Sequence, residues 1–208
     1  MSKNKIDLSK VKELYDDNID KHGLDSKSVG WPDADSQNLR FEKLLSVVAD
    51  KDKPFTINEL GCGYGELFKY AIRENYNLEK YNGYDISPKM LAAAKNYLED
   101  TRVELIENAT INASLDYCIT SGIFNVKFGE QTEQWDDYIK NTLLNMFEFA
   151  NRGISFNLLT TYVDFETPDL FYADPMHYFN FCKKNLSKYV NLIHDYNLYE
   201  WTITVKKA

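Results

Sequence analysis

Three glycines at alternate positions, Gly61, Gly63 and Gly65, separate a short apolar run from a helical pattern in the segment ELGCGYGEL. Glycine accepts positive φ angles and has no Cβ, so such a loop lets the backbone come close to a ligand. Carboxylates flank the loop, with Glu59 before it and Glu66 after it. Glu66 would compete with a phosphate for the helix N-terminus, and the Lys of a phosphate-binding loop is missing. The loop therefore predicts a site for a cationic or zwitterionic group, and a tight turn without a ligand is the alternative.

Asp85 offers a second kind of contact, because it ends the next expected strand, 20 residues after Gly65. A carboxylate at this place accepts hydrogen bonds from the ribose hydroxyls of a nucleoside. The glycine loop, Glu59 and Asp85 together indicate a nucleoside-bearing ligand with a positively charged, phosphate-free tail. S-adenosylmethionine combines adenosine, a sulfonium and an amino acid, and so has this form.

The segments ELGCGYG and YNGYDIS resemble the first two motifs of the class I S-adenosylmethionine-dependent methyltransferases, in particular small bacterial members. The resemblance covers residues 54 to about 160, and an expected terminal hairpin extends it to the end of the chain. It implies an α/β, doubly wound fold, with a mostly parallel seven-stranded sheet that ends in an antiparallel hairpin. It also implies an enzyme that uses S-adenosylmethionine, releases S-adenosylhomocysteine and needs no metal.

The resemblance further implies which residues contact the cofactor. Glu59 and the glycine loop would line the methionine part, and Asp85 would hold the ribose. Ile86 and Met90 would pack near the adenine. Many family members place an Asp-Ala pair after the third strand, whereas this chain has Asn108 in the segment ENA, whose amide oxygen would meet the adenine amine. The segment SGIFN, residues 121–125, would line the methyl-transfer site. The implied cofactor residues are Glu59, Gly61, Cys62, Gly63, Tyr64, Gly65, Asp85, Ile86, Met90, Asn108, Ser121 and Gly122.

The first fifty residues are expected to form a helical lid over the ligand crevice. Within them, residues 30–45 resemble the corresponding segment of the small bacterial methyltransferases. Gln37 and Arg40 stand at i and i+3, so they share a helix face and are added to the cofactor candidates. Arg40 has no acidic partner within reach on its own helix, since Glu42 at i+2 faces elsewhere. Its planar guanidinium is predicted to clamp the carboxylate of the cofactor or an anionic acceptor, with a solvated surface position as the alternative.

Aromatic and polar residues near the expected crevice are candidates for contact with the methyl acceptor. Tyr15 can close over a sulfonium through a cation–π contact, and Trp31 can form an apolar wall. The connection after the fifth expected strand is long, and long connections in compact domains are often functional. The candidate acceptor residues are Tyr15, Trp31, Asn125, Tyr162, Tyr172 and Tyr178.

An alcohol acceptor would need a general base to take its proton. His177 is the first candidate, because it lies in the first turn of an expected helix near the crevice rim, and Asp174 and His22 follow it. Asp174 has a structural alternative as the N-cap of that helix, with Pro175 at the first helical position. An amine need only be deprotonated before attack, and an anionic oxygen needs no base, so the sequence leaves open whether a base exists.

Alternating strands and helices are expected to position these residues. The expected strands cover residues 54–60, 80–86, 102–106, 115–121 and 153–159, and the helices cover residues 65–75, 87–100 and 133–151. Ser87 is the expected N-cap of the helix that begins at Pro88. This rhythm predicts a parallel sheet with helices on both faces and a ligand crevice at the carboxyl ends of the strands.

The two ends of the chain depart from this rhythm. Helices are expected over residues 8–20, with Ser9 as cap, and over 36–50, with Ser36 as cap. Toward the C-terminus the expected elements are a helix at 174–187 and two strands at 188–196 and 198–207, separated by Asn197. The two strands predict an antiparallel hairpin.

The composition limits the classes of partner. The chain has 208 residues and predicts a single domain, divided into the lid at 1–50 and an α/β core at 54–208. Its formal net charge of -8 argues against nucleic acid as the main partner. Three distant cysteines predict neither a metal site nor disulfides, and Cys62 is interpreted as a packing residue. No apolar run approaches a membrane helix, so a cytoplasmic monomer or homodimer is expected.

The favoured hypothesis is methyl transfer to a small-molecule acceptor, on an oxygen of a sugar, a sugar nucleotide or a small phosphorylated metabolite. The resemblance to the bacterial group indicates surface-polysaccharide or specialised biosynthesis. The alternatives are N-methylation, methylation of a protein or RNA, and a non-catalytic S-adenosylmethionine-binding protein. An NAD-binding protein is a further alternative, which Glu66 argues against.

Overall fold

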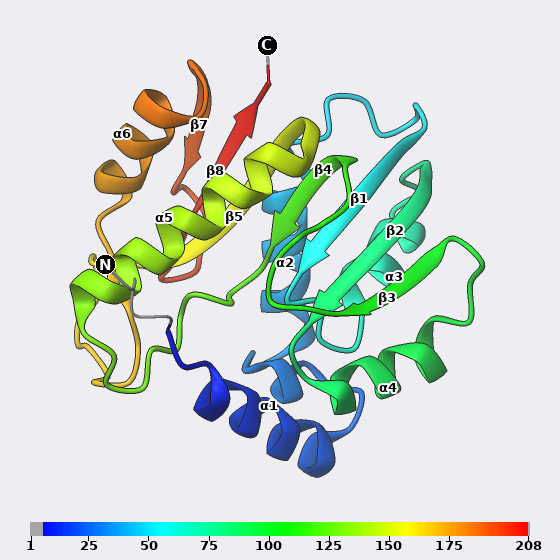
Figure 1. Ribbon diagram of the computed structural model, residues 1–208, viewed down its shortest axis with the longest axis horizontal. Coiled ribbons are helices and arrows are strands. Elements are labelled where there is room, and N and C mark those ends of the chain that lie inside the picture. The colour runs from blue at the N-terminus through cyan, green and yellow to red at the C-terminus, as the bar shows by residue number, and fades with distance from the viewer. Residues whose placement is uncertain (1–5, 208) are drawn as a thin grey trace.

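The computed structural model describes residues 6–207, which form a sheet of eight strands in the order β3-β2-β1-β4-β5-β8-β7, with β6 paired to β5 (Figure 1). Strands β5, β8 and β7 pair antiparallel to one another, and the remaining pairs are parallel. The strands are β1 Phe55–Leu60, β2 Leu78–Asp85, β3 Val103–Glu107, β4 Leu115–Thr120, β5 Ala150–Thr160, β6 Tyr172–Ala173, β7 Tyr189–Ile193 and β8 Glu200–Lys206. The mostly parallel α/β sheet with its antiparallel C-terminal strands is confirmed.

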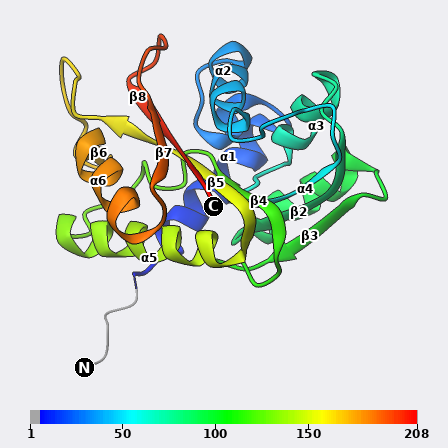
Figure 2. The ribbon, with the colours of Figure 1, turned by 90° about the horizontal axis from the view of Figure 1, so that it is seen from above.

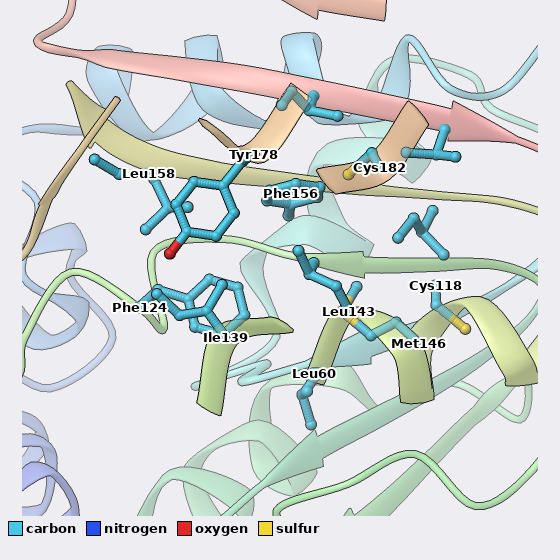
Figure 3. Close-up of a cluster of buried hydrophobic side chains, with 14 of the residues drawn as sticks. Leu60, Cys118, Phe124, Ile139, Leu143, Met146, Phe156, Leu158, Tyr178 and Cys182 are labelled. Atoms are coloured by element: carbon cyan, nitrogen blue, oxygen red, sulfur yellow. The ribbon is translucent and has the colours of Figure 1, made fainter. Parts of the chain in front are cut away.

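Helices cover both faces of this sheet, with α5 and α6 opposite α2 and α3 (Figure 2). The helices are α1 Ser9–His22, η1 Ser26–Val29, α2 Ala34–Leu45, α3 Glu66–Arg73, α4 Pro88–Leu98, α5 Thr132–Phe149 and α6 Pro175–Asn185. One apolar core joins α2, α3 and α4 to the sheet, and another joins α5 and α6 to the opposite face. Figure 3 shows part of this second core, in which Tyr178 lies close to Leu158 and Phe156.

Two of the four expected helix caps are confirmed and two are wrong. The Oγ of Ser87 accepts from the amide of Met90 at 3.0 Å, and Asp174 caps α6. Helix α1 begins at Ser9 itself, so Ser9 is not its cap. Helix α2 begins earlier than expected, because Asp33 accepts from the amide of Ser36 at 2.7 Å and takes the capping role.

The sheet differs from the expectation in two places. The short strand β6 raises the strand count from seven to eight. The hairpin strands are shorter than expected, and residues 194–199 connect them instead of Asn197 alone. Residues 108–114 lead from β3 to β4 without a helix, and polar contacts hold this segment on the sheet: the Nδ2 of Asn58 donates to the carbonyl of Ala113 at 2.7 Å.

Helix α1 lies across the end of the sheet toward which the arrowheads of β1, β2 and β4 point (Figure 1). Its buried residues are Val11 and Ile19. Polar contacts join it to α4: Asp16 accepts from the Oγ of Ser87, and Lys89 pairs with Asp20. Within residues 6–207, no helix has both the length and the apolar character that a membrane crossing requires.

Candidate functional site

A cavity of about 680 Å³, measured out to its open mouth, lies between α1 and the carboxyl ends of β1, β2, β3 and β4. Its position is the place where open α/β sheets bind ligands. The lining residues are Leu8, Val11, Tyr15, Val29, Leu60, Gly61, Gly63, Asp85, Ile86, Met90, Asn108, Ala109, Ser121, Gly122, Ile123 and Tyr138. Four loops and four helices, α1, η1, α4 and α5, therefore form one site although they are far apart in the sequence.

Two glycines of the loop face this cavity and have no room for a side chain. Gly61 has a φ of +74°, and a Cβ there would lie 2.1 Å from the Cγ2 of Ile123. Gly63 has a φ of +54°, and a Cβ there would lie 2.8 Å from the Cγ1 of Val29. Both the conformation and the space thus require glycine. Gly65 lies outside the lining and is the residue before α3.

Asp85 presents a carboxylate that the backbone holds in place. One oxygen accepts from the amide of Gly63 at 2.9 Å, and the other accepts from the amide of Ser87 at 2.8 Å. A carboxylate has about four acceptor positions, so Asp85 keeps capacity for further donors in the cavity. Burial raises the pKa of Asp85, although these amide hydrogen bonds oppose that shift.

Glu59 lies in a smaller pocket of about 280 Å³ that adjoins the cavity and shares Val29, Gly61 and Ser121 with it. The hydroxyl of Tyr81 donates to the buried Glu59 carboxyl group, whose pKa is raised to about 8 by burial. A cation in this adjoining pocket would favour the ionised form. The other residues that line only the adjoining pocket are Trp31, Gln37, Phe41, Cys62, Tyr64 and Glu66.

The remaining cofactor candidates divide between the two spaces. Ile86, Met90, Asn108, Ser121 and Gly122 line the cavity, and Gln37, Cys62 and Tyr64 line the adjoining pocket. The Oγ of Ser121 is buried and has no hydrogen-bond partner among the described residues. Burial raises the pKa of the Cys62 thiol well above its ordinary value, which suits a packing residue rather than a nucleophile.

The structure corrects the hypothesis for Arg40. Its guanidinium forms a buried ion pair with Glu200, with a closest distance of 2.7 Å, and also donates to the carbonyl of Ser36 at 2.8 Å. Glu200 is 160 positions away in the sequence, so the helix pattern gave no sign of this partner. Arg40 is neither the expected clamp nor a solvated surface residue, since only 6% of it is exposed.

The three candidates for a general base lie outside the cavity lining, which corrects that hypothesis. The Nε2 of His177 lies 3.1 Å from the Oδ1 of Asp136 on α5, and nearly half of its side chain is exposed. Asp174 accepts from the amide of Met176 at 2.9 Å and has the capping role that was its alternative. His22 is the last residue of α1.

The acceptor candidates are also dispersed. Tyr15 lines the cavity, and burial raises its pKa to about 12. Tyr162 is 69% exposed, and Tyr172 belongs to β6. Tyr178 lies in the core, where its hydroxyl donates to Asp136 at 2.8 Å, so it is unavailable to a ligand. Asn125 follows the cavity-lining segment and is buried, and its Oδ1 has no partner within residues 6–207.

Four lining residues were not expected from the sequence: Leu8, Val11, Val29 and Tyr138. Val11 and Tyr138 belong to helices whose apolar positions also predict core packing. Val29 is an apolar residue within a polar segment, and this contrast could have identified it. Ile123 lines the cavity together with Ser121 and Gly122 of the predicted segment SGIFN. Burial raises the pKa of Tyr138 to about 12.

Comparison with known proteins identifies the family. A family model described as a methyltransferase domain matches residues 58–128. Rv1506c of Mycobacterium tuberculosis (strain ATCC 25618 / H37Rv), a candidate methyltransferase, is 44% identical over 158 residues, which cover 74% of this chain and 95% of that protein. The chain therefore belongs to the methyltransferase family, and the resemblance seen in its motifs is confirmed.

Solved structures agree on the fold. Magnesium protoporphyrin IX methyltransferase (ChlM) from Synechocystis PCC 6803, with bound S-adenosylmethionine, has a TM-score of 0.67 at 14% identity over 99% of each chain. The complex of DhpI with S-adenosylhomocysteine has a TM-score of 0.62 at 12% identity over 92% of each chain. The pyocyanin biosynthetic protein PhzM has a TM-score of 0.57 at 16% identity, over 97% of this chain and 68% of that one.

Proposed function

We propose that this methyltransferase-family chain transfers a methyl group from S-adenosylmethionine to an oxygen of a small-molecule acceptor. The acceptor classes are a sugar, a sugar nucleotide or a small phosphorylated metabolite of surface-polysaccharide or specialised biosynthesis. The observation that carries the donor half of the proposal is the cavity in which Gly61 and Gly63 face the carboxylate of Asp85. The acceptor half rests on the sequence resemblance.

The residues present fit S-adenosylmethionine. Gly61 and Gly63 carry no side chain where a Cβ would collide with the walls of the site, so their backbone can lie close to a ligand, and Asp85 has free acceptor positions for two ribose hydroxyls. Ile86 and Met90 supply apolar walls for a purine, and Glu59 supplies a carboxylate for a cationic tail in the adjoining pocket. When bound, the cofactor supplies a methyl group on a sulfonium, which is open to in-line attack. The chain aligns the reactants and excludes water.

The lining also bears on the acceptor. Among the described residues that line the cavity, the titratable side chains are Tyr15, Asp85 and Tyr138. The two phenols have pKa values of about 12 and stay protonated near neutrality, and Asp85 is committed to the ribose. Among the proposed acceptor classes we therefore favour a phosphorylated acceptor, whose oxygen is already ionised and whose charge the sulfonium balances, over the neutral hydroxyl of a sugar, which needs a base. An amine acceptor is the second candidate, since it need only be deprotonated before it attacks the methyl group.

The donor site is tested by calorimetry with S-adenosylmethionine, S-adenosylhomocysteine and NAD on the wild type and on Asp85→Ala. Micromolar binding of the first two ligands, weakened by the substitution, is the expected result. Binding of NAD alone would refute the proposal. A screen of sugars, sugar nucleotides and phosphorylated metabolites, read by formation of S-adenosylhomocysteine, then tests the acceptor. Turnover with none of them, but with amines, would move the assignment to N-methylation.

A further inference from the structure

Five residues from five segments form a closed ring of contacts beside the cavity: Trp31, Arg40, Gly122, Asn157 and Glu200. Both carboxylate oxygens of Glu200 accept from the guanidinium of Arg40, at 2.7 to 3.0 Å. The same carboxylate accepts from the Nδ2 of Asn157 at 2.8 Å. The Oδ1 of Asn157 in turn accepts from the amide of Gly122 at 2.8 Å.

Trp31 closes the ring. The guanidinium carbon of Arg40 lies 3.7 Å from the centre of the Trp31 ring, a cation–π contact. The other edge of the indole meets Gly122, where an added Cβ would lie 2.5 Å from its Cζ2 and Cη2 atoms. Gly122 has a φ of +74°, so both its backbone conformation and its close contact with the indole require glycine.

The ring is buried in the molecule. Glu200 is 1% exposed, Asn157 is 0% exposed and Arg40 is 6% exposed. Removing two opposite charges from water costs free energy, which the mutual attraction and the hydrogen bonds must offset, so such a pair is weak evidence for a gain in stability. What the pair does supply is geometry, since a bidentate guanidinium–carboxylate contact fixes the orientation of both groups.

The ring touches the ligand spaces at two points. Gly122 lines the cavity, and Trp31 lines the adjoining pocket. Ser121, next to Gly122, lines both and forms the wall between them. Glu200 itself lines neither space, so it can act on a ligand only through the other members of the ring.

We propose that Glu200 is a positioning residue for the ligand site. Through Arg40 it holds the Trp31 ring of the lid, and through Asn157 it holds the backbone of Gly122, so that it sets the shape of the wall around Ser121. The identity of the ligand rests on the proposed function, whereas the fixing of Trp31 does not.

The test compares the wild type with Glu200→Gln, which keeps the shape of the side chain and removes its charge. S-adenosylhomocysteine is the probe, and its Kd is measured well below the Tm of each variant. Substitutions in contact networks that do not touch the ligand change coupling by factors of roughly 3 to 30, and we expect a loss of affinity in this range. We also expect acrylamide to quench more tryptophan fluorescence, because Trp31 is released while Trp135 and Trp201 stay buried.

Two controls separate positioning from general stability. Asp100→Asn breaks another bidentate pair, in which both oxygens of Asp100 accept from Arg102 at 2.7 to 2.9 Å, near the amino end of β3. It should change neither the Kd nor the quenching. In a Trp31→Phe background, Glu200→Gln should cause no further quenching. A conservative Glu200→Asp variant keeps the negative charge on a side chain that is one methylene shorter. It should bind S-adenosylhomocysteine more tightly than Glu200→Gln does, although less tightly than the wild type.

Two outcomes overturn the inference. One is a Glu200→Gln protein that has a lower Tm but binds S-adenosylhomocysteine like the wild type, which would leave the ring a structural role alone. The other is unchanged quenching, which would show that Trp31 does not depend on Glu200. Failure of the wild type to bind S-adenosylhomocysteine would instead contradict the proposed function, and the quenching experiment would still decide whether Glu200 holds Trp31.

Discussion

The cavity has two sides that are attached to the protein in different ways. On the sheet side, Gly61 and Gly63 lie in the loop that directly follows β1, Asp85 is the last residue of β2, and backbone amides hold its carboxylate. On the lid side, Val11 and Tyr15 of α1 close the cavity mainly with apolar surface. The sheet side therefore has a fixed geometry before a ligand arrives, whereas the lid side has contacts that can separate.

The attachments of α1 illustrate the difference. Lys89 and Asp20 pair with side chains that are 49% and 62% exposed, and such pairs contribute little to stability. The buried apolar anchors of the helix are few. A ligand enclosed by the cavity must enter past one of its sides, and the lid is the side that costs less to move. Substitutions on the sheet side should thus affect binding most, and those at exposed lid contacts least.

The largest effect is expected for Gly61→Ala. A positive φ costs an L-residue roughly 1–2 kcal/mol, and the contact with Ile123 adds about 1–3 kcal/mol of overpacking. Because the added methyl group and the displaced Ile123 enter the cavity, we expect the affinity for S-adenosylhomocysteine, measured by calorimetry, to fall at least about 100-fold.

Gly129 offers a matched control, since its φ is +79° and an added Cβ meets no atom within 4 Å. Gly129→Ala should lose stability through the φ angle alone and bind the ligand normally. Ile123→Ala in the Gly61→Ala protein should restore part of the affinity, because it removes the clashing Cγ2. Equal binding losses at positions 61 and 129 would contradict the importance of the space at Gly61.

A smaller loss is expected for Asp85→Asn. The amide keeps the size of the side chain but removes the negative charge, and hydrogen bonds to charged groups contribute about 1.5–3 kcal/mol. The Kd for S-adenosylhomocysteine should rise roughly 10- to 100-fold, with a larger relative loss for adenosine than for methionine as competitor. An equal loss for both competitors would mean that Asp85 acts through the glycine loop rather than on the ribose.

The same contrast explains how far the sequence predicts the molecule. The glycine loop directly follows β1 and Asp85 ends β2, so the strand-and-helix rhythm placed both at one edge of the sheet. The short β6 escaped prediction, because its two residues form a strand only through pairing with β5. Arg40 was misassigned for a related reason, since a local pattern carries no information about Glu200.

The next prediction concerns pH and the buried Glu59. Its pKa is about 8 in the folded protein against 4.5 as the ordinary value, so between these limits the folded state keeps a proton that the unfolded state releases. Stability must therefore fall as pH rises from about 4.5 to about 8, by at most about 1.4 kcal/mol per pH unit from this group. Urea unfolding of the wild type and Glu59→Gln should differ in this slope.

The same measurement with added S-adenosylmethionine tests whether the positive charge of the ligand lies beside Glu59. A cation beside Glu59 stabilises the ionised carboxylate, so the slope attributed to Glu59 should become smaller in the presence of ligand. Parallel curves for the wild type and Glu59→Gln across this pH range would mean that Glu59 titrates near its ordinary value. A ligand that leaves the slope unchanged would place its positive charge elsewhere in the site.

The smallest effect is expected at the polar contacts of α1, and a comparison of two of them tests which contact holds this helix over the cavity. Asp20→Asn removes an exposed pair and should change the free energy of unfolding by less than about 1 kcal/mol, with the Kd for S-adenosylhomocysteine within about twofold of the wild type. Asp16 is compared with Asp20, because the Asp16 side chain is only 13% exposed and its carboxylate accepts a hydrogen bond from the buried Ser87. Asp16→Asn should weaken binding more than Asp20→Asn does, with faster ligand dissociation in stopped-flow measurements. If both variants release the ligand at the wild-type rate, the apolar face of α1 holds the lid without help from its polar contacts.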